Sequence, residues 1–495
     1  MNTRKSSLDK DLEKIVHVEA AARTTGNLAF SHGLAAVFLG VSAILAAMQA
    51  GVNADAAIVV LAAILGGYMA LNIGANDVAN NVGPAVGSRA LTMVGALVIA
   101  AIFESAGALL AGGDVVSTIS KGIIDPALVP DSGIFIWAMM AALISSAVWV
   151  NIATFVGAPV STTHAVVGGV MGAGIAAVGF QLVNWATLGA IAASWVISPV
   201  LGGVVAALFL AFIKYNVIYQ EDKIAAARRW VPMLVALMAG AFAFYLAIKG
   251  FKRIWQPDPG TIGPIAIAVF ASVWLVMRPI VRRQSEGMEN RNQSLRILFR
   301  IPLICSAALL SFAHGANDVA NAIGPLAAIL HSAEFGDVSS KAVVPVWIMV
   351  IGAFGISLGL FLYGPKLVRM VGGKITKMNP MRAYCVALSA AITVIIASWL
   401  GLPVSSTHIA VGAVFGVGFF REYFTRHSRR RREMVLRARG GEANGDDPIA
   451  PEELRHRKLV RRSHFLTIVA AWVVTVPATA LLAALAFYAL TAVSG

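Results

Sequence analysis

The sequence predicts an all-α polytopic membrane protein. We expect two inverted repeats, each with a re-entrant helical hairpin and a helix broken near the bilayer midplane. Apolar runs long enough to span a bilayer follow one another along almost the whole chain. Within them, an eleven-residue polar stretch occurs twice, and so does a Gly-x-Pro turn followed by hydroxyl residues. Duplicated polar stretches inside apolar sequence are typical of secondary transporters.

The composition excludes an ordinary soluble protein. Apolar residues make up 58% of the chain and charged residues 13%, whereas a soluble domain has about 25% charged residues. The net charge of +14 does not indicate nucleic-acid binding, because the basic residues lie between apolar segments, as in cytoplasmic loops. Residues 1–26 are polar and precede any apolar run, so we expect a cytoplasmic N-terminus without a cleaved signal peptide.

The apolar segments divide the chain into six parts, of which two are repeats. In chain order these are 1–55, the cytoplasmic N-terminus plus an extra membrane helix; 56–213, the first repeat; 214–296, connecting helices and a basic cytoplasmic loop; 297–420, the second repeat, inverted; 421–463, a basic flexible cytoplasmic loop; and 464–495, the final membrane helix of the second repeat. The predicted spans are about 28–50, 56–84, 90–112, 186–213, 230–250, 262–281, 297–330, 344–364 and 464–490, and the apolar stretch at about 133–156 belongs to the first re-entrant hairpin. The loop at 113–132 is poor in Lys and Arg and is expected outside.

The repeated polar stretch, here called the GAND motif, is GANDVANNVGP at 74–84 and GANDVANAIGP at 315–325. Nine of its eleven positions are identical. Gly at the start and Pro at the end both weaken a helix. Counted from a cytoplasmic N-terminus, the first copy runs inward and the second outward, so the two repeats have opposite orientation.

The second pattern is GAPVSTTH at 157–164 and GLPVSSTH at 401–408. A Gly-x-Pro turn ends one helix, and Ser or Thr begins the next. Both flanks of the second copy, 366–382 and 421–463, are rich in Lys and Arg, so that hairpin should enter and leave from the cytoplasm. The first copy has Lys-poor flanks and should enter from outside.

The hairpin tips are candidate anion sites, because hydroxyls and free backbone N–H groups at a helix start bind oxyanions. The residues concerned are Ser161, Thr162, Thr163, Ser405, Ser406 and Thr407. Two tips approaching from opposite sides could hold a tetrahedral anion between them. The alternative is that these hydroxyls are ordinary caps of buried helices.

The GAND carboxylates would repel an anion unless a cation lies between them, and hard cations take carboxylate, amide and carbonyl oxygens. The candidate ion-coupling residues are Asn76, Asp77, Asn80, Glu104, Asn317, Asp318 and Asn321, with a possible sodium site at Asp77, Asn80, Asp318 and Asn321. Glu104 lies within a predicted span, where it could be an ion ligand, a proton carrier or a hydrogen-bonded structural group. His164, His408 and His314 adjoin these motifs without the spacing of a metal site, so a structural role is expected, with ligand or proton roles open.

The duplicated GAND motifs and the PVSTTH and PVSSTH tips resemble those of the inorganic phosphate transporter (PiT) family, from about residue 56 to the C-terminus. The resemblance implies a homodimer in the cytoplasmic (inner) membrane that imports phosphate by symport with sodium or protons. It places anion binding on the tip hydroxyls and on Asp77 and Asp318, and it gives Glu104 a counterpart in the family. It implies no cofactor and no enzyme activity.

One position departs from the family pattern. Ala387 stands where many members carry a second glutamate, which weakens the case for a complete sodium site and favours proton coupling. The alternative function is a sulfate permease on the same scaffold. Sulfate is also a tetrahedral dianion, but at neutral pH it cannot donate a hydrogen bond to Asp77 or Asp318.

Overall fold

The computed structural model describes residues 29–50, 55–158, 160–250, 257–338, 344–370, 378–428 and 462–494. Across these ranges the chain is helical, and its one β-bridge joins Ile124 to Val183. Eleven helices among the described residues are long and apolar enough to cross a membrane. The predicted all-α membrane fold is therefore confirmed.

The helices match the predicted spans closely. The first half contains a helix at Ala29–Gln49, α2 (Ala56–Asn76), α3 (Val78–Gly87), α4 (Met93–Ala111), α5 (Gly113–Ser117), α6 (Ser132–Val156), α7 (Thr162–Val178) and α8 (Trp185–Ile213). The connecting segment contains α9 (Lys223–Tyr245), α10 (Pro259–Gln284) and α11 (Asn292–Leu298). The second half contains α12 (Arg300–Phe335), α13 (Val346–Met370), α14 (Pro380–Trp399), α15 (Ser406–His427) and α18 (Arg462–Ser494).

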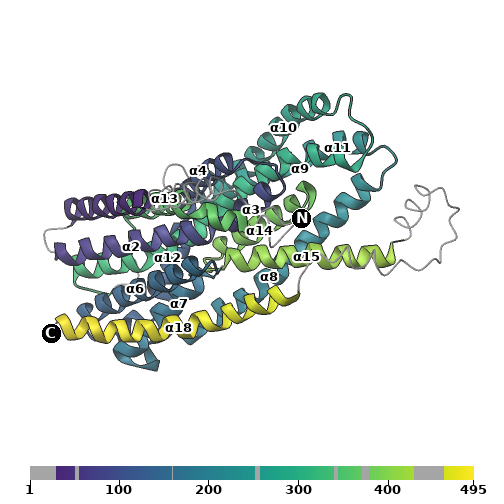
Figure 1. Ribbon diagram of the computed structural model, residues 1–495. Coiled ribbons are helices and arrows are strands. Elements are labelled where there is room, and N and C mark those ends of the chain that lie inside the picture. Colours follow the sequence, from purple (N-terminus) through teal and green to yellow (C-terminus); the bar gives the residue numbers. More distant parts are fainter. Residues whose placement is uncertain are drawn as a thin grey trace, which may run out of the picture.

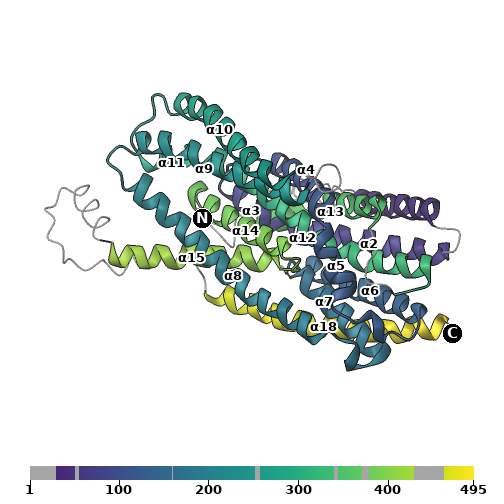
Figure 2. The same cartoon turned by 180° about the vertical axis from the view of Figure 1, so that it is seen from behind.

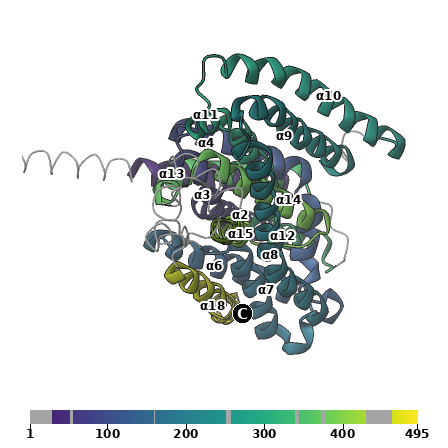
Figure 3. The ribbon, with the colours of Figure 1, turned by 90° about the vertical axis from the view of Figure 1, so that its right-hand side faces the viewer.

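The two halves of the chain interlock instead of forming separate domains. Helix α2 packs on α13 and α12 packs on α4, so each GAND helix contacts a helix of the other half. The exchange is repeated further along, where α8 packs on α14 and α15, and α18 packs on α6 and α7 (Figures 1 and 2). Figure 3 shows α9 and α10 on the side of the molecule away from α18.

Glycines make these close crossings possible. A Cβ at Gly74 would overlap the backbone of Ile356 in α13, and one at Gly315 would overlap the backbone of Glu104 in α4. In a membrane, small residues allow helix backbones to approach and gain van der Waals contact. The GAND glycines therefore serve helix packing as well as backbone freedom.

The two hairpins occupy opposite ends of the bundle. Figure 1 shows α6 and α7 side by side toward the end where the C-terminus lies, and α14 and α15 toward the other end. Gly157 and Gly401, at the hairpin turns, have φ of 76° and 70°, in the left-handed region that favours glycine. The Gly-x-Pro signal therefore located both helix ends correctly.

The two GAND motifs differ in helix continuity. Asp77 stands as a single turn residue between α2 and α3, but its φ of −85° and ψ of −32° are helical and its N–H donates to the Ile73 carbonyl (2.9 Å), whereas α12 runs through Asp318 without such a turn. His314 Nε2 lies 2.7 Å from Asp318 Oδ2, four residues further along the same helix, while Ile73 stands at the corresponding position before Asp77. The helix break expected near each GAND motif is therefore absent at Asp318, and at Asp77 it amounts to one turn residue with helical dihedrals.

Two predicted loops contain more structure than expected. Residues 113–132 form α5, a π-helical turn at Thr118–Gly122 and a 3-10 turn at Pro126–Leu128, with Val115, Ile119 and Ile123 buried. Helix α15 continues through 421–427 into the predicted loop 421–463, of which 429–461 lie outside the described residues. The predicted N-terminal segment 1–26 also lies outside them.

Candidate functional site

The predicted anion and ion residues come together where the starts of α7 and α15 meet the two GAND helices. Each of these side chains is at most 7% exposed. The residues gathered there are Asn76, Asp77, Asn80, Glu104, Ser161, Thr162, Thr163, Asn317, Asp318, Asn321, Ser405, Ser406 and Thr407. Every site residue predicted from the sequence is therefore part of one buried cluster or in contact with it.

Ser161 and Ser405 cap their helices. The Ser161 hydroxyl oxygen accepts a bond from the backbone N–H of His164 (3.1 Å), and Ser405 accepts one from His408 (3.3 Å). This geometry satisfies a backbone donor that a helix start otherwise leaves free. Both serines thus make the contact of an ordinary helix cap, which was the alternative to an anion site.

Asn76 and Asn317 hold the hairpin turns in place. Asn76 Nδ2 donates to Thr154 Oγ1 (2.8 Å), and its Oδ1 accepts from the backbone N–H of Val160 (3.4 Å). Asn317 does the same in the second repeat, with Ser398 Oγ (2.9 Å) and the N–H of Val404 (3.2 Å). Both amides are thus engaged by their own hairpin.

Asp77 is the meeting point of the two hairpins. Its Oδ2 accepts a hydrogen bond from Thr162 Oγ1 (2.6 Å) and its Oδ1 accepts one from Thr407 Oγ1 (3.1 Å). Asn80 Nδ2 also donates to Thr407 Oγ1 (2.8 Å). The hairpins touch directly, since Thr163 Oγ1 donates to the Val404 carbonyl (3.0 Å).

Asp318 has a different environment. Its Oδ2 lies 2.7 Å from His314 Nε2 and accepts a long bond from Ser406 Oγ (3.4 Å). Its Oδ1 and the Oδ1 of Asn321 have no hydrogen-bond partner in the described part of the chain. Asn321 Nδ2 donates to Thr162 (3.3 Å) and Thr163 (3.1 Å) of the opposite repeat.

This arrangement could hold a cation. Asp77, His314 and Asp318 each offer one ligand atom, and these atoms lie within 4.8 Å of one another. Unpartnered buried oxygens are costly without a hydrogen bond or an ion. The carboxylate and amide oxygens are the ligands that sodium and other hard cations take.

Glu104 is fully buried and both of its oxygens are engaged. Oε1 accepts from Asn81 Nδ2 (2.7 Å), and Oε2 lies 2.6 Å from His314 Nδ1. The sequence reasoning did not select Asn81, although the second GAND motif has Ala322 at that position. The exchange of Asn81 for Ala322 is one of only two differences between the GAND motifs, and it could have identified Asn81 as a functional residue.

The two tip histidines contact each other, and one of them contacts an indole ring. The rings of His164 and His408 lie 4.4 Å apart and that of Trp195 lies 3.7 Å from His164, all measured between centroids. Ala387, where the family pattern has a glutamate, is buried among apolar side chains of α14. It supplies no oxygen to the site.

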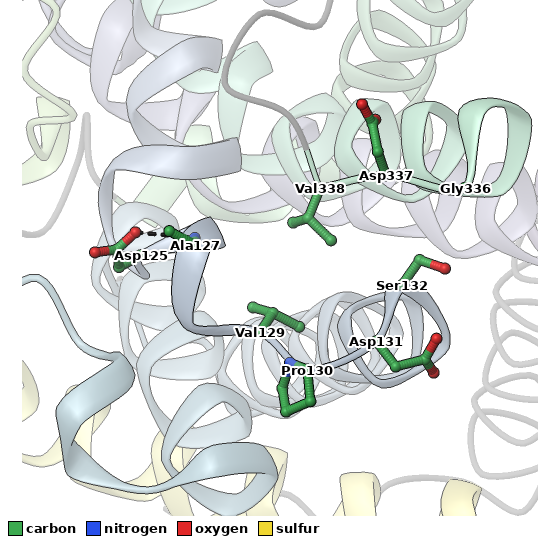
Figure 4. A pocket seen from close by; sticks show the side chains of 9 residues that line it. All are labelled: Asp125, Ala127, Val129, Pro130, Asp131, Ser132, Gly336, Asp337 and Val338. Atoms are coloured by element: carbon green, nitrogen blue, oxygen red, sulfur yellow. Dashed lines mark hydrogen bonds between the residues drawn. The ribbon is translucent and has the colours of Figure 1, made fainter.

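A second, acidic pocket lies away from the hairpin tips, between the turn before α6 and the end of α12 (Figure 4). Its volume is about 540 Å³. Asp125 and Asp131 accept backbone N–H bonds there, and Asp337 pairs with His331. These carboxylates therefore have local structural partners.

Comparison with known proteins supports the resemblance. The family model described as the phosphate transporter family matches residues 73–483. A Helicobacter pylori (strain J99) protein named as a candidate phosphate permease is 46% identical, over 97% of this chain and 98% of its own length. One from Pyrococcus furiosus is 36% identical, over 88% of this chain and 97% of its own length.

A solved structure agrees with both. The protein titled "The sodium-dependent phosphate transporter" is 34% identical with a TM-score of 0.76, over 88% of this chain and 99% of its own. That family consists of transporters, not enzymes. This chain is a member of the phosphate transporter family.

Proposed function

We propose that the protein imports inorganic phosphate by symport with a cation, either a proton or sodium. Phosphate lies between the two hairpin tips in this proposal, and the cation lies beside it at the GAND carboxylates. The observation that carries it is the convergence of Thr162 and Thr407, from opposite hairpins, on Asp77. The relatives named for phosphate support the same substrate.

The tip hydroxyls explain how phosphate could be exchanged. Each hydroxyl that donates to Asp77 can donate instead to a phosphate oxygen, and a phosphate hydroxyl can donate to the carboxylate that is released. Burial makes these bonds strong relative to water. Because each tip belongs to a different hairpin, movement of one tip opens the site toward one side only. This is the alternating access we propose, with re-entrant hairpins from opposite faces.

The cation offsets the charge of the anion. An anion entering a negative interior is opposed by about 2.3 kcal/mol per charge per 100 mV. We place the cation at Asp77, Asn80, Asp318 and Asn321, where the two unpartnered oxygens support such a site. Sodium is the ion named for the similar solved structure, while Ala387 removes an oxygen ligand and favours the proton.

Phosphate uptake into proteoliposomes tests the proposal. We expect uptake when an inward sodium or proton gradient is imposed, with arsenate competing and sulfate competing poorly. Replacing sodium by choline, and separately adding a protonophore, identifies the coupling ion. Efficient sulfate uptake without arsenate competition would instead support the sulfate permease.

A further inference from the structure

A chain of four buried polar side chains connects α3, α4 and α12. Asn81 Nδ2 donates to Glu104 Oε1 (2.7 Å), and Glu104 Oε2 lies 2.6 Å from His314 Nδ1. On its other side, His314 Nε2 lies 2.7 Å from Asp318 Oδ2. None of the four is more than 1% exposed. The chain ends on a carboxylate of the proposed ion site.

The first repeat has no equivalent of this chain. Ile73 precedes the first GAND motif where His314 precedes the second, and Ala322 stands in the second motif where Asn81 stands in the first. The two repeats also differ in the residue that packs against the first glycine of the GAND motif. Gly315 closely approaches Glu104, whereas Gly74 makes the corresponding approach to Ile356. The two repeats therefore hold their carboxylates by different means.

This difference separates the two aspartates. Asp77 is held by hydroxyls of the hairpin tips, which belong to the parts that we propose to move. Asp318 is backed by groups on the packed helices α3, α4 and α12, and its contact with a hairpin tip is the long bond from Ser406 Oγ (3.4 Å). Its Oδ2 faces His314, which leaves Oδ1 as the oxygen without a hydrogen-bond partner among the described residues.

We infer that Asn81, Glu104 and His314 are positioning residues that fix the Asp318 carboxylate so that Oδ1 is presented to the coupling cation. The inference rests on the proposed function and deepens it. Both oxygens of Glu104 are occupied by protein groups, so Glu104 acts through His314 and does not bind the cation itself. Partners behind a metal ligand orient it in the same way at metal sites, where their loss lowers affinity by about 10–100-fold.

Two substitutions at Glu104 separate positioning from direct ion binding. In Glu104→Gln, the side-chain carbonyl still accepts from Asn81 and the amide can donate to His314 Nδ1, so Nε2–H can still face Asp318. We expect its half-saturating concentration of coupling cation in phosphate uptake to stay within about threefold of wild type. Glu104→Leu removes both bonds, and we expect an increase of about tenfold or more.

The inference is overturned if the two Glu104 variants raise the half-saturating cation concentration equally. If Glu104→Gln raises the half-saturating concentration as much as Glu104→Leu, the charge of Glu104 itself acts on the ion. Ser105→Ala is the matched control, because Ser105 is the next residue on α4 and pairs with Ser357 Oγ (2.8 Å) instead of joining the chain. A loss of folded protein alone would leave this constant unchanged, so it measures positioning.

A thermal double-mutant cycle tests the chain without any transport. Asn81 and Asp318 are not in direct contact through any hydrogen bond described above, so we expect coupling between Asn81→Ala and Asp318→Asn to pass through Glu104 and His314. We expect their shifts in melting temperature in detergent not to add, whereas those of Ser105→Ala and Asp318→Asn should add. Additive shifts for both pairs overturn the inference. If Asn81→Ala does not fold, Asn81→Ser takes its place.

These readouts also separate the inference from the proposed function. Wild-type protein that takes up no phosphate would refute the proposed function, while the melting cycle would still decide whether the chain couples Asn81 to Asp318. Wild-type uptake together with additive melting shifts would refute the inference and leave phosphate symport standing.

Discussion

Thr407 of the second hairpin donates a hydrogen bond to Asp77 of the first repeat over 3.1 Å, although 330 positions separate them in the chain. Thr162, from the first hairpin, donates to the other oxygen of the same carboxylate (2.6 Å). The buried carboxylate of Asp77 therefore contacts both hairpins at once. This makes the tip hydroxyls the most direct place to test the proposed anion site.

Replacing Thr407 by Val should weaken phosphate binding and preserve the fold. Val keeps the shape and removes the hydroxyl donor, and a hydrogen bond to a charged group is worth about 1.5–3 kcal/mol. We therefore expect the phosphate KM to rise about tenfold or more in initial-rate uptake. Thr393→Val is the control, because Thr393 is also buried but donates to the Ser389 carbonyl within α14. Equal KM changes in the two variants would argue against a phosphate contact at Thr407.

Adding a methyl group at Gly315 should destabilise the protein. A Cβ there would overlap the Glu104 backbone, and overpacking of this kind costs about 1–3 kcal/mol. We expect Gly315→Ala to lower the thermal stability of the purified protein in detergent. Gly40→Ala should not, because nothing lies within 4 Å of a Cβ at Gly40. A wild-type melting temperature for Gly315→Ala would mean that the α4–α12 crossing is looser than described.

Cysteine labelling tests the proposed topology. Arg369 and Arg426 flank the second hairpin and are exposed, as are Ala127 and Asp258 near the opposite membrane face in our scheme. Cysteines at 369 and 426 should both react only from the cytoplasmic side, and those at 127 and 258 only from outside. Reaction of 369 and 426 from opposite sides would show that the second hairpin spans the membrane.

The sequence predicted most of the helices because membrane spans are long and charges mark their ends. The α6–α7 and α14–α15 hairpins followed from the Gly-x-Pro turns, whose glycines take left-handed φ values. The burial of Val115, Ile119 and Ile123 within 113–132 was not predicted. A shortage of basic residues indicates on which side of the membrane a segment lies. It does not tell whether the segment is an exposed loop or is packed against the bundle, as Ile119 is against Gly324 of α12.

The sequence predicted which residues form the candidate site, but it did not predict their hydrogen-bond partners. Duplication identified Asp77, Asp318 and the tip hydroxyls, since polar groups at membrane depth need a reason to be there. It could not tell that Asn76 and Asn317 hold turns, because hydrogen bonds across 82 or 85 positions depend on tertiary packing. His314 was noticed but not chosen, because a single histidine gives no spacing pattern.

The sequence also did not predict that α12 would run through the second GAND motif without a turn. Both GAND copies carry the same Gly, Asn and Asp, so sequence comparison predicts equal helix breaks. The residue before each motif, Ile73 or His314, changes what Asp77 and Asp318 can pair with. The two aspartates therefore have different partners although the Gly, Asn and Asp residues of the two motifs match.

Gradient-driven accumulation by Asp77→Asn tests the central claim most directly. Asn keeps the shape and one oxygen but removes the charge that balances a cation beside phosphate. Asp318→Asn serves as the matching variant in the other repeat. With equal amounts of folded protein in proteoliposomes, wild type should concentrate phosphate, and each variant should accumulate no more than protein-free liposomes. Accumulation by Asp77→Asn at the wild-type level would contradict the account, because phosphate and its coupling cation would then not meet at Asp77.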